Sequence, residues 1–420
     1  MQNIDEIFKN AKNAKTKLAK IKHENIISFL QGTAESIIHN ATNIIKANSR
    51  DMKIAESMGL SSAMLERLEL NDKKLKSIQE SIHKIALLEN PIGKEIYRFQ
   101  NHAKLDIQKV STPIGVIGII YESRPNVTSD TAALCIKSGN VCILKGGKEA
   151  QNSNEAITSC FFTNMDKYKI PKNSITMLQA MQNRDDLKRM LRAKNYIDLI
   201  IPRGGEGLIN FVLENSLIPV IKQDKGVCHI FAHSSCNQNK AIGIIINAKT
   251  SRPSVCNSCE CLLIDKSIAD EFLPKVALKL IEKNTILKGS SECVKVLKAH
   301  NIQCDEIQAC SYHIEYNDNI LNLKIVDGLN GAIEHINEFS SGHSESILCE
   351  DNNIAQEFLD TIDSACVYVN ASTRFSDGGE FGFGAEVGIS TSKIHARGPM
   401  GIESLTSYKY KIIGNGQIRV

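Results

Sequence analysis

The first part of the chain, from Ile4 to Leu88, repeats apolar residues at intervals of three and four positions. Ile26, Phe29 and Leu30 form one such group, and lysine, asparagine and glutamate fill many of the positions between groups. A repeat of this period is typical of helices that bury one face. We therefore expect a set of amphipathic packing helices here, without chemistry of their own.

After Pro91 the pattern changes to short, dense apolar runs. Residues 97–110 alternate loosely between polar and apolar, which predicts a half-exposed hairpin. The predicted strands that follow are 115–120, 141–144, 197–201, 218–221 and 229–232, and the helical patterns between them cover 127–137, 153–166, 185–193 and 205–215. Strands that alternate with helices predict βαβ units and a parallel sheet with helices on both faces.

A second α/β stretch begins near Asn237. Its predicted helices are 240–249 and 268–283, and its predicted strands are 262–264, 347–349 and 367–370. Beyond Ala371 the chain is rich in glycine, which is typical of tight backbone turns near a ligand or an interface. Residues 408–420 are predicted to form a strand arm. The pattern as a whole predicts an α/β protein.

Composition and charge narrow the class of protein. The 420 residues are enough for two or three domains, and a composition of 42% hydrophobic and 23% charged residues is typical of a globular protein. The net charge of +3 is spread along the chain, without the basic block of a nucleic-acid-binding protein. No apolar run reaches the roughly 18 residues of a membrane span. The charged N-terminus contains no signal-peptide core, so we expect a cytoplasmic protein with free thiols.

Three predicted strands end in polar turns, which is where α/β folds place their ligands. The first of these segments is 115–128. The second is 141–149, in which Lys145 and Lys148 flank two glycines and suit phosphate or ribose groups. The third contains Gly204 and Gly205 directly before a predicted helix. Taken alone, this last turn is better interpreted as structural, because it lacks the full G-x-G-x-x-G spacing of dinucleotide-binding motifs.

Cys256 has the setting expected of a nucleophile, because it lies in a polar turn between a predicted helix and a predicted strand. With Cys259 and Cys261 it also forms a C-x-x-C-x-C cluster, which leaves open a zinc or redox site. A structural zinc site takes about four ligands, and Cys304 and Cys310 offer only a loose second pair. We therefore predict no metal, and we expect Cys259 and Cys261 to point into the core.

Four segments in order along the chain carry a family resemblance: YESRPNVT at 121–128, RPSVCN at 252–257, VNASTRF at 369–375 and HARGPMG at 395–401. In these segments the chain resembles the γ-glutamyl phosphate reductases, a family of the aldehyde dehydrogenase superfamily. The resemblance is close over about 107–264 and 367–419. It implies an aldehyde-dehydrogenase-like α/β fold with two Rossmann-like domains and a small oligomerisation arm.

The resemblance also implies a division of the chain into three parts. These are an NADP(H)-binding domain over 1–224 with an oligomerisation hairpin at about 97–112, a catalytic domain over 225–395, and a tail over 396–420 that completes the arm. The expected partners are a small-molecule substrate and further copies of the chain, in a dimer or tetramer. A glutamate 5-kinase, which would deliver the unstable acyl phosphate, is a candidate contact.

By resemblance, Cys256 attacks γ-glutamyl phosphate, phosphate leaves, and NADPH reduces the thioester to glutamate semialdehyde in proline biosynthesis. Asn126 matches the asparagine that stabilises the oxyanion together with the Cys256 backbone N–H. The implied cofactor contacts are Lys145 to the adenine-side ribose, Lys148 to a 2′-phosphate, Gly204 and Gly205 to the pyrophosphate, and Glu315 to the nicotinamide ribose. The candidate anchors for the substrate's carboxylate or phosphate are Arg124, Arg374, His395 and Arg397.

One position departs from the wider superfamily. Hydrolytic aldehyde dehydrogenases carry a glutamate base where this chain has Lys222. A reductase that starts from an acyl phosphate needs no activated water, so Lys222 disfavours an aldehyde-to-acid oxidase. The alternatives that remain are a CoA-acylating aldehyde dehydrogenase, a non-catalytic scaffold on the same fold, and the zinc or redox module.

Overall fold

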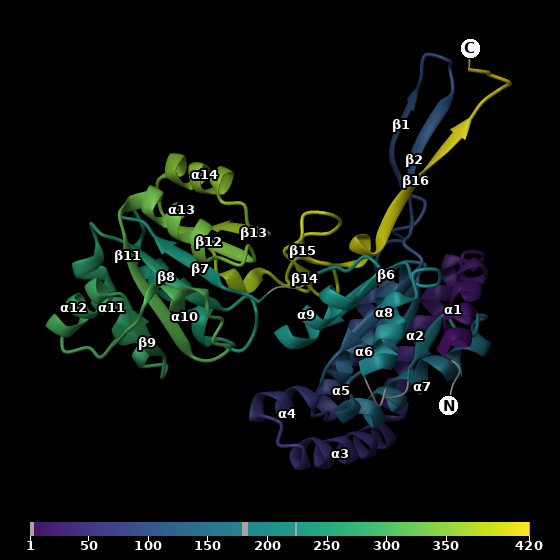
Figure 1. Ribbon diagram of the computed structural model, residues 1–420, viewed down its shortest axis with the longest axis horizontal. Helices are drawn as coiled ribbons and strands as arrows, with labels where there is room; N and C mark the ends of the chain where they lie inside the picture. Colours follow the sequence, from purple (N-terminus) through teal and green to yellow (C-terminus); the bar gives the residue numbers. More distant parts are fainter. Residues whose placement is uncertain (1–3, 179–183, 223–224, 420) are drawn as a thin grey trace. The chain divides into compact units, whose positions relative to one another are not determined.

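The computed structural model describes residues 4–178, 184–222 and 225–419 (Figure 1). The chain forms two compact units. Unit 1 comprises residues 1–223, 382–388 and 400–420, and unit 2 comprises residues 224–381 and 389–399. Each unit contains its own parallel sheet with helices, so the predicted α/β fold class is confirmed. Among the described residues, no helix is both long enough and apolar enough to cross a membrane.

Unit 1 begins with five helices that pack through apolar faces. They are α1 (Ile4–Leu18), α2 (His23–His39), α3 (Ala41–Ser57), α4 (Ser62–Leu68) and α5 (Asp72–Leu87). In α2 the buried residues Ile26, Phe29 and Leu30 follow the spacing seen in the sequence. The side chain of Asn71 begins α5 by accepting the Lys74 N–H at 3.0 Å. The helices expected from the apolar repeat are therefore present.

The central sheet of unit 1 is parallel, with strand order β5-β4-β3-β6. Its strands are β3 (Val116–Tyr121), β4 (Val141–Lys145), β5 (Ile175–Met177) and β6 (Leu199–Arg203), and its helices are α6 (Pro125–Lys137), α7 (Gln151–Lys167), α8 (Arg184–Arg192) and α9 (Glu206–Asn215). The prediction of a strand at 218–221 is wrong. This segment forms a single bridge, between Ile200 and Val220, because Pro219 has no N–H with which to extend a ladder.

A three-stranded antiparallel sheet forms an arm of unit 1. It consists of β1 (Glu95–Gln100), β2 (Asp106–Pro113) and β16 (Thr406–Ile413), with β2 in the middle. Figure 1 shows β16, which is far away in the sequence, lying beside the hairpin of β1 and β2. Every residue of β1 is exposed. We refer to these three strands as the arm.

Unit 2 is built on a parallel sheet of seven strands, in the order β10-β9-β11-β8-β7-β12-β13. The strands are β7 (Cys228–Ala232), β8 (Cys259–Asp265), β9 (Ile286–Gly289), β10 (Asp305–Glu306), β11 (Ile320–Val326), β12 (Ser344–Leu348) and β13 (Cys366–Val369). The helices are α10 (Gln238–Thr250), α11 (Ala269–Ile281), α12 (Ser291–Ala299), α13 (Gly328–Phe339) and α14 (Asn352–Thr361). Cys259 and Cys261 of β8 are both buried, as expected, but in two different core clusters.

The end of the predicted catalytic domain differs from the observed division of the chain. Strand β14 (Ile389–Ser390) pairs antiparallel with β15 (Gly398–Pro399), and this pairing holds residues 396–399 in unit 2. Residues 382–388 belong to unit 1, where the Val387 N–H donates to the Met400 carbonyl at 2.9 Å. With a single boundary between residues 395 and 396, this part of the chain would leave unit 2 once. The observed chain crosses between the two units more often than that.

Candidate active site

Cys256 lies in the loop between α10 and β8 and is partly exposed, whereas nine of the other cysteines are buried. Residues at and just before the N-terminal end of β7 fix the position of its main chain. The Cys228 thiol donates to the Cys256 carbonyl oxygen at 3.2 Å. Gly226 lies against the same carbonyl, because a Cβ built at Gly226 would stand 1.7 Å from that oxygen. The position of the candidate nucleophile thus depends on a close backbone approach that only glycine allows.

Glu315 reaches this loop from the segment between η2 (Ala309–His313) and β11. Its Oε1 accepts the Gly226 N–H at 2.9 Å. Since Gly226 packs on Cys256, the structure connects Glu315 with the backbone of the candidate nucleophile. The sequence analysis selected both residues, and the structure brings them into one neighbourhood of unit 2. The role of Glu315 towards a cofactor remains a prediction.

A buried ion pair lies in the same part of unit 2. The Lys249 ammonium at the end of α10 is 3.2 Å from Oε2 of Glu260, and both side chains are buried. Glu260 Oε1 has no hydrogen-bond partner. Burial raises the pKa of Glu260 to about 8, although Lys249 lowers it in part, and the charge of Glu315 raises it further. Burial thus favours the protonated form of Glu260, and the Lys249 ammonium favours the charged form.

Arg374 is joined to the residue that follows Cys256. Its guanidinium donates to Oδ1 of Asn257 and, through Nε, to Oγ of Ser251 at 3.2 Å. Asn257 donates in return to the Arg374 carbonyl at 3.3 Å and to the Ser376 carbonyl at 2.9 Å. Burial, and then the nearby charge of Arg252, lower the pKa of Arg374. Arg374 therefore ties η3 (Thr373–Phe375) to the Cys256 loop and places a positive charge beside it.

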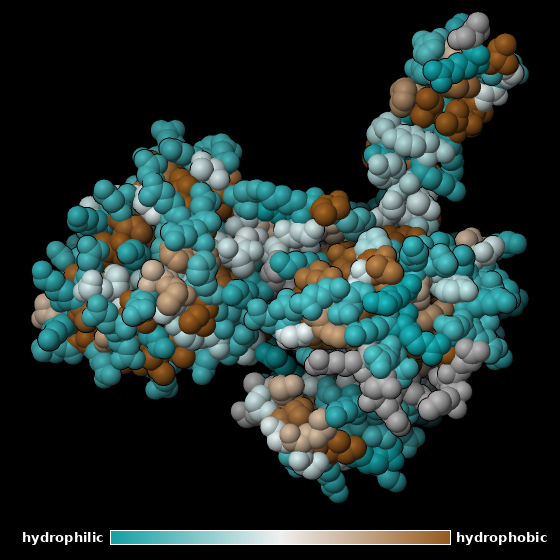
Figure 2. Space-filling model, in the orientation of Figure 1, coloured by the Kyte–Doolittle hydropathy of each residue, from teal (hydrophilic) through white to brown (hydrophobic). Residues whose placement is uncertain are grey.

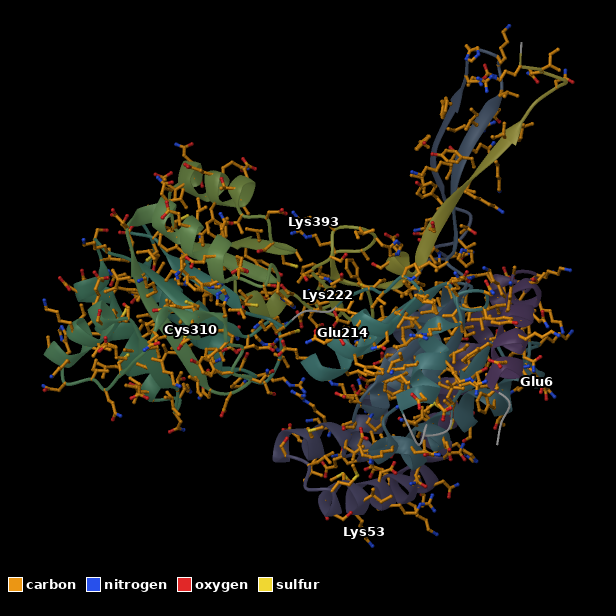
Figure 3. The ribbon with its side chains drawn as sticks, in the orientation of Figure 1. Glu6, Lys53, Glu214, Lys222, Cys310 and Lys393 are labelled. Carbon is orange, nitrogen blue, oxygen red and sulfur yellow. The ribbon has the colours of Figure 1, made fainter. Side chains whose placement is uncertain are left out.

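Arg397 is already engaged within unit 2. Its guanidinium donates to Oδ1 and to the backbone carbonyl of Asp363, both at 2.6 Å. Lys393, which is labelled in Figure 3, pairs with the same carboxylate. These two cations lower the pKa of Asp363. An anionic substrate would have to displace Asp363 to use Arg397, whereas His395 is exposed on the same segment.

Asn126 lies in the first turn of α6 in unit 1, directly after Arg124 and Pro125. Its side chain is exposed, and its Nδ2 is 3.5 Å from Oδ2 of Asp130 one turn later. Ser81 donates to the other oxygen of Asp130 at 2.7 Å. Burial raises the pKa of Asp130 to about 6. Asn126 and Cys256 belong to different units, so a shared oxyanion site stays a prediction.

The carboxyl ends of β3 and β4 are joined by a buried carboxylate. Oε1 of Glu149 accepts both the backbone N–H and the hydroxyl of Ser123, each at 2.8 Å. Lys145 ends β4 and is half-buried, while Lys148 is exposed at the start of η1 (Lys148–Ala150). Burial lowers the pKa of Lys145, and Glu149 and Glu122 oppose this change. The two lysines predicted to meet a cofactor thus lie on one turn.

The glycine turn after β6 holds a carboxylate in this structure. Oε2 of Glu122, which follows β3, accepts the Gly205 N–H at 2.9 Å directly before α9. A Cβ at Gly204 would stand 2.5 Å from the same oxygen. The Gly205 N–H that was predicted to meet a pyrophosphate therefore donates to Glu122 in this structure. A bound pyrophosphate would require this carboxylate to move.

Lys222 is exposed in the segment that follows β6 and α9, and Figure 3 labels its side chain. It supplies no carboxylate at the position of the hydrolytic base. The sequence analysis missed four residues that the structure places in these two neighbourhoods. They are Glu122, Glu149, Gly226 and Glu260. For Glu122 and Glu149 a signal existed, since they belong to the segments 115–128 and 141–149, whereas Gly226 and Glu260 lie outside the segments that the sequence analysis selected.

Comparison with known proteins places these observations in a family. The model of the "Aldehyde dehydrogenase family" matches residues 1–295. The chain is 50% identical to a γ-glutamyl phosphate reductase of Nitratiruptor sp., over 99% of this chain and 100% of that protein. It is 48% identical to the one from Nautilia profundicola, with the same coverage.

A solved structure agrees with the sequence relatives. The crystal structure of γ-glutamyl phosphate reductase from Thermotoga maritima matches with a TM-score of 0.94 and 40% identity, over 99% of each chain. The relatives and this structure extend over nearly the whole chain, including both units and the arm. The chain therefore belongs to the aldehyde dehydrogenase family and, within it, to the γ-glutamyl phosphate reductases.

Proposed function

We propose that the chain reduces L-glutamyl 5-phosphate to L-glutamate 5-semialdehyde, with NADPH as reductant and release of phosphate, in proline biosynthesis. The observation that carries the proposal is the partly exposed Cys256, whose main chain is fixed by Gly226 and Cys228. A thiol in a fixed loop suits covalent catalysis, because the sulfur must meet the acyl carbon in one geometry. The names of the relatives support this substrate.

The chain contains a nucleophile, hydrogen-bond donors and cationic side chains that suit acyl transfer. The Cys256 sulfur forms a bond to the acyl carbon, and the bond from that carbon to the phosphate oxygen breaks, so that phosphate leaves with the electron pair. The amide of Asn126 and the backbone N–H of Cys256 are the donors proposed for the oxyanion. Arg374 supplies positive charge beside the loop. We assign Arg374, Arg124 and His395 to the anionic groups of the substrate, and Arg397 only after release from Asp363.

The residues at the carboxyl ends of β3, β4 and β6 fit a nicotinamide dinucleotide phosphate in their donor set. Lys145 and Lys148 offer two cations on one turn, and Gly204 and Gly205 precede the N-terminus of α9. We propose that these residues hold NADP(H) and that Glu315 orients the nicotinamide ribose. When bound, the cofactor supplies the hydride for reduction of the thioester. Preference for NADPH over NADH would come from Lys148.

A lysine at position 222 suits a reductase. A carboxylate base at this position would activate water, and the water would hydrolyse the thioester to the free acid before it could be reduced. The position offers an ammonium group in place of a carboxylate base, and it is exposed. The names of the relatives that are 50% and 48% identical to the chain support phosphate release over the CoA-acylating reaction.

The arm supports the proposal that the chain acts as a homo-oligomer, a dimer or a tetramer. Figure 2 shows apolar side chains gathered along it, and the exposed ones include Ile96, Phe99, Tyr408, Ile412 and Ile413. Exposed apolar residues gathered on one small sheet are typical of a surface that a partner covers. We propose cytoplasmic activity with free thiols, and a glutamate 5-kinase remains the candidate donor of the acyl phosphate.

The test runs the reaction in reverse, because the acyl phosphate is short-lived. NADP⁺ reduction is measured with glutamate semialdehyde, with and without phosphate, for wild type and Cys256→Ser. Phosphate-dependent activity that disappears in the variant supports the thioester route. Activity without phosphate would identify an oxidase and refute the proposal. Activity that requires coenzyme A in place of phosphate would favour the acylating alternative.

A further inference from the structure

Three potential metal ligands meet in the core of unit 2. They are His229 on β7, Cys261 on the adjacent strand β8, and His335 on α13, and all three are buried. His229 and Cys261 are directly paired in the sheet, so their side chains leave the same face. One ligand atom from each residue lies within 4.8 Å of the others.

The separation of two of these atoms matches a metal-bound pair. Zn–S bonds of about 2.3 Å and Zn–N bonds of about 2.0–2.1 Å at a tetrahedral angle place sulfur and nitrogen about 3.6 Å apart. Cys261 Sγ and His335 Nε2 are 3.6 Å apart and form a hydrogen bond in this structure. His229 must approach these atoms more closely for all three to bind one ion. Its ring centroid is 5.4 Å from that of His335, so a small side-chain movement would suffice.

Neither ring nitrogen of His229 forms a hydrogen bond, although the side chain is fully buried. A buried imidazole without a partner loses its hydration without compensation. Oε2 of Glu345 lies 3.2 Å from Nδ1 and also accepts the His229 backbone N–H at 2.7 Å. A carboxylate beside one nitrogen of a histidine is the arrangement that orients metal-ligating imidazoles.

The surroundings provide an approach for a cation. His335 also lines a surface pocket of about 410 Å³. Asp327, Glu334 and Glu338 line the same pocket, with Lys324 as the basic residue among them.

We propose that His229, Cys261 and His335 form a buried binding site for one soft divalent cation of the Zn²⁺ class, with Glu345 as the residue that positions His229. A thiolate and two imidazoles are the ligands that zinc prefers. Binding displaces the Cys261 thiol proton to solvent, and we expect a water molecule to take the fourth position. The ion would tie β7 and β8 to α13 and stabilise unit 2 without taking part in hydride transfer.

The test uses the full-length Cys256→Ser protein, so that the candidate nucleophile cannot bind the metal. After treatment with a chelator, it is titrated with Co²⁺ and then with Zn²⁺. The expected result is one Co²⁺ per chain with release of one proton per Co²⁺, visible d–d bands with a sulfur-to-cobalt charge-transfer band, displacement by Zn²⁺ without further proton release, and a higher melting temperature. Absence of these bands, or of any binding, overturns the proposal.

Variants locate the ion. In the same background, Cys261→Ala removes the charge-transfer band, and His335→Gln and Glu345→Gln weaken Zn²⁺ binding by about tenfold or more. Cys259→Ala is the matched control, since Cys259 is buried on the same strand but packs in the other core cluster, and it should bind as the parent does. Unchanged binding by folded Cys261→Ala and His335→Gln would place the ion elsewhere and refute the site. If one of these two variants does not fold, the other variant and the spectrum of the Cys256→Ser parent decide whether the site binds the ion.

Discussion

Gly226→Ala should disable the enzyme, because the Cys256 backbone leaves no room for a side chain at this position. The new Cβ would lie 1.7 Å from the Cys256 carbonyl oxygen, 2.5 Å from its carbonyl carbon and 2.7 Å from its Cα. Ordinary contact begins at 3.4 Å, so the Cys256 backbone or the Gly226 segment must give way by 3.4 − 1.7 = 1.7 Å. A misplacement of about 1 Å in a catalytic group can cost about 10² in rate. We therefore expect kcat/KM to fall by about 10² or more.

The assay is phosphate-dependent NADP⁺ reduction, with the melting temperature measured in parallel. Gly243→Ala in α10 is the control, because nothing lies within 4 Å of a Cβ built there. It should keep full activity and gain up to about 1 kcal/mol, since alanine favours a helix over glycine. If Gly226→Ala stays within about threefold of wild type, the thiol is not positioned through this backbone contact.

Three further predictions follow from other residues. Asn126→Ala should lower kcat/KM by about 10²–10³ with little change in melting temperature, because the side chain is exposed; an equal loss of stability would argue for a structural role. Lys148→Ala should raise KM for NADPH by roughly 10–100-fold and leave KM for NADH nearly unchanged; equal effects on both would remove Lys148 from the 2′-phosphate. Burial lowers the pKa of His343 from 6.5 to about 4, so its contribution to stability is present above pH 6.5 and lost as pH falls towards 4. Urea unfolding at pH 7.5 and 4.5 should show wild type losing roughly 2–3 kcal/mol more than His343→Gln, and equal losses would contradict this.

The sheet strands near the candidate site could be predicted from the sequence because they are continuous apolar runs. The strands β3, β4, β6 and β7 each overlap such a run over most of their length. Strand β11 was missed, since Asn322 and Lys324 interrupt its apolar pattern. Asn322 is nevertheless buried, because it donates to the Ser311 carbonyl and accepts from the Tyr316 hydroxyl. Partners of this kind come from other parts of the chain, so local pattern cannot show that a polar residue is satisfied.

The same reasoning explains what the sequence could show of the candidate site. Cys256 and Asn126 stand in segments whose residue types carry a family resemblance, and both could be named in advance. The contact of Gly226 with Cys256 could not, since it depends on β7 and the Cys256 loop meeting in space. The engagement of Arg397 by Asp363 also appears only in the structure, and it changes what that arginine can do for a substrate.

The pairing of β16 with β2 has a consequence for how the chain folds during synthesis. The hairpin of β1 and β2 is made early, but its third strand follows only after the whole of unit 2. Until then one edge of β2 has unpaired N–H and C=O groups beside exposed apolar side chains, which is a template for aggregation. Closing so long a loop is also slow. A ribosome paused within unit 2 would therefore present an unfinished arm, and chaperone binding to nascent chains should peak there.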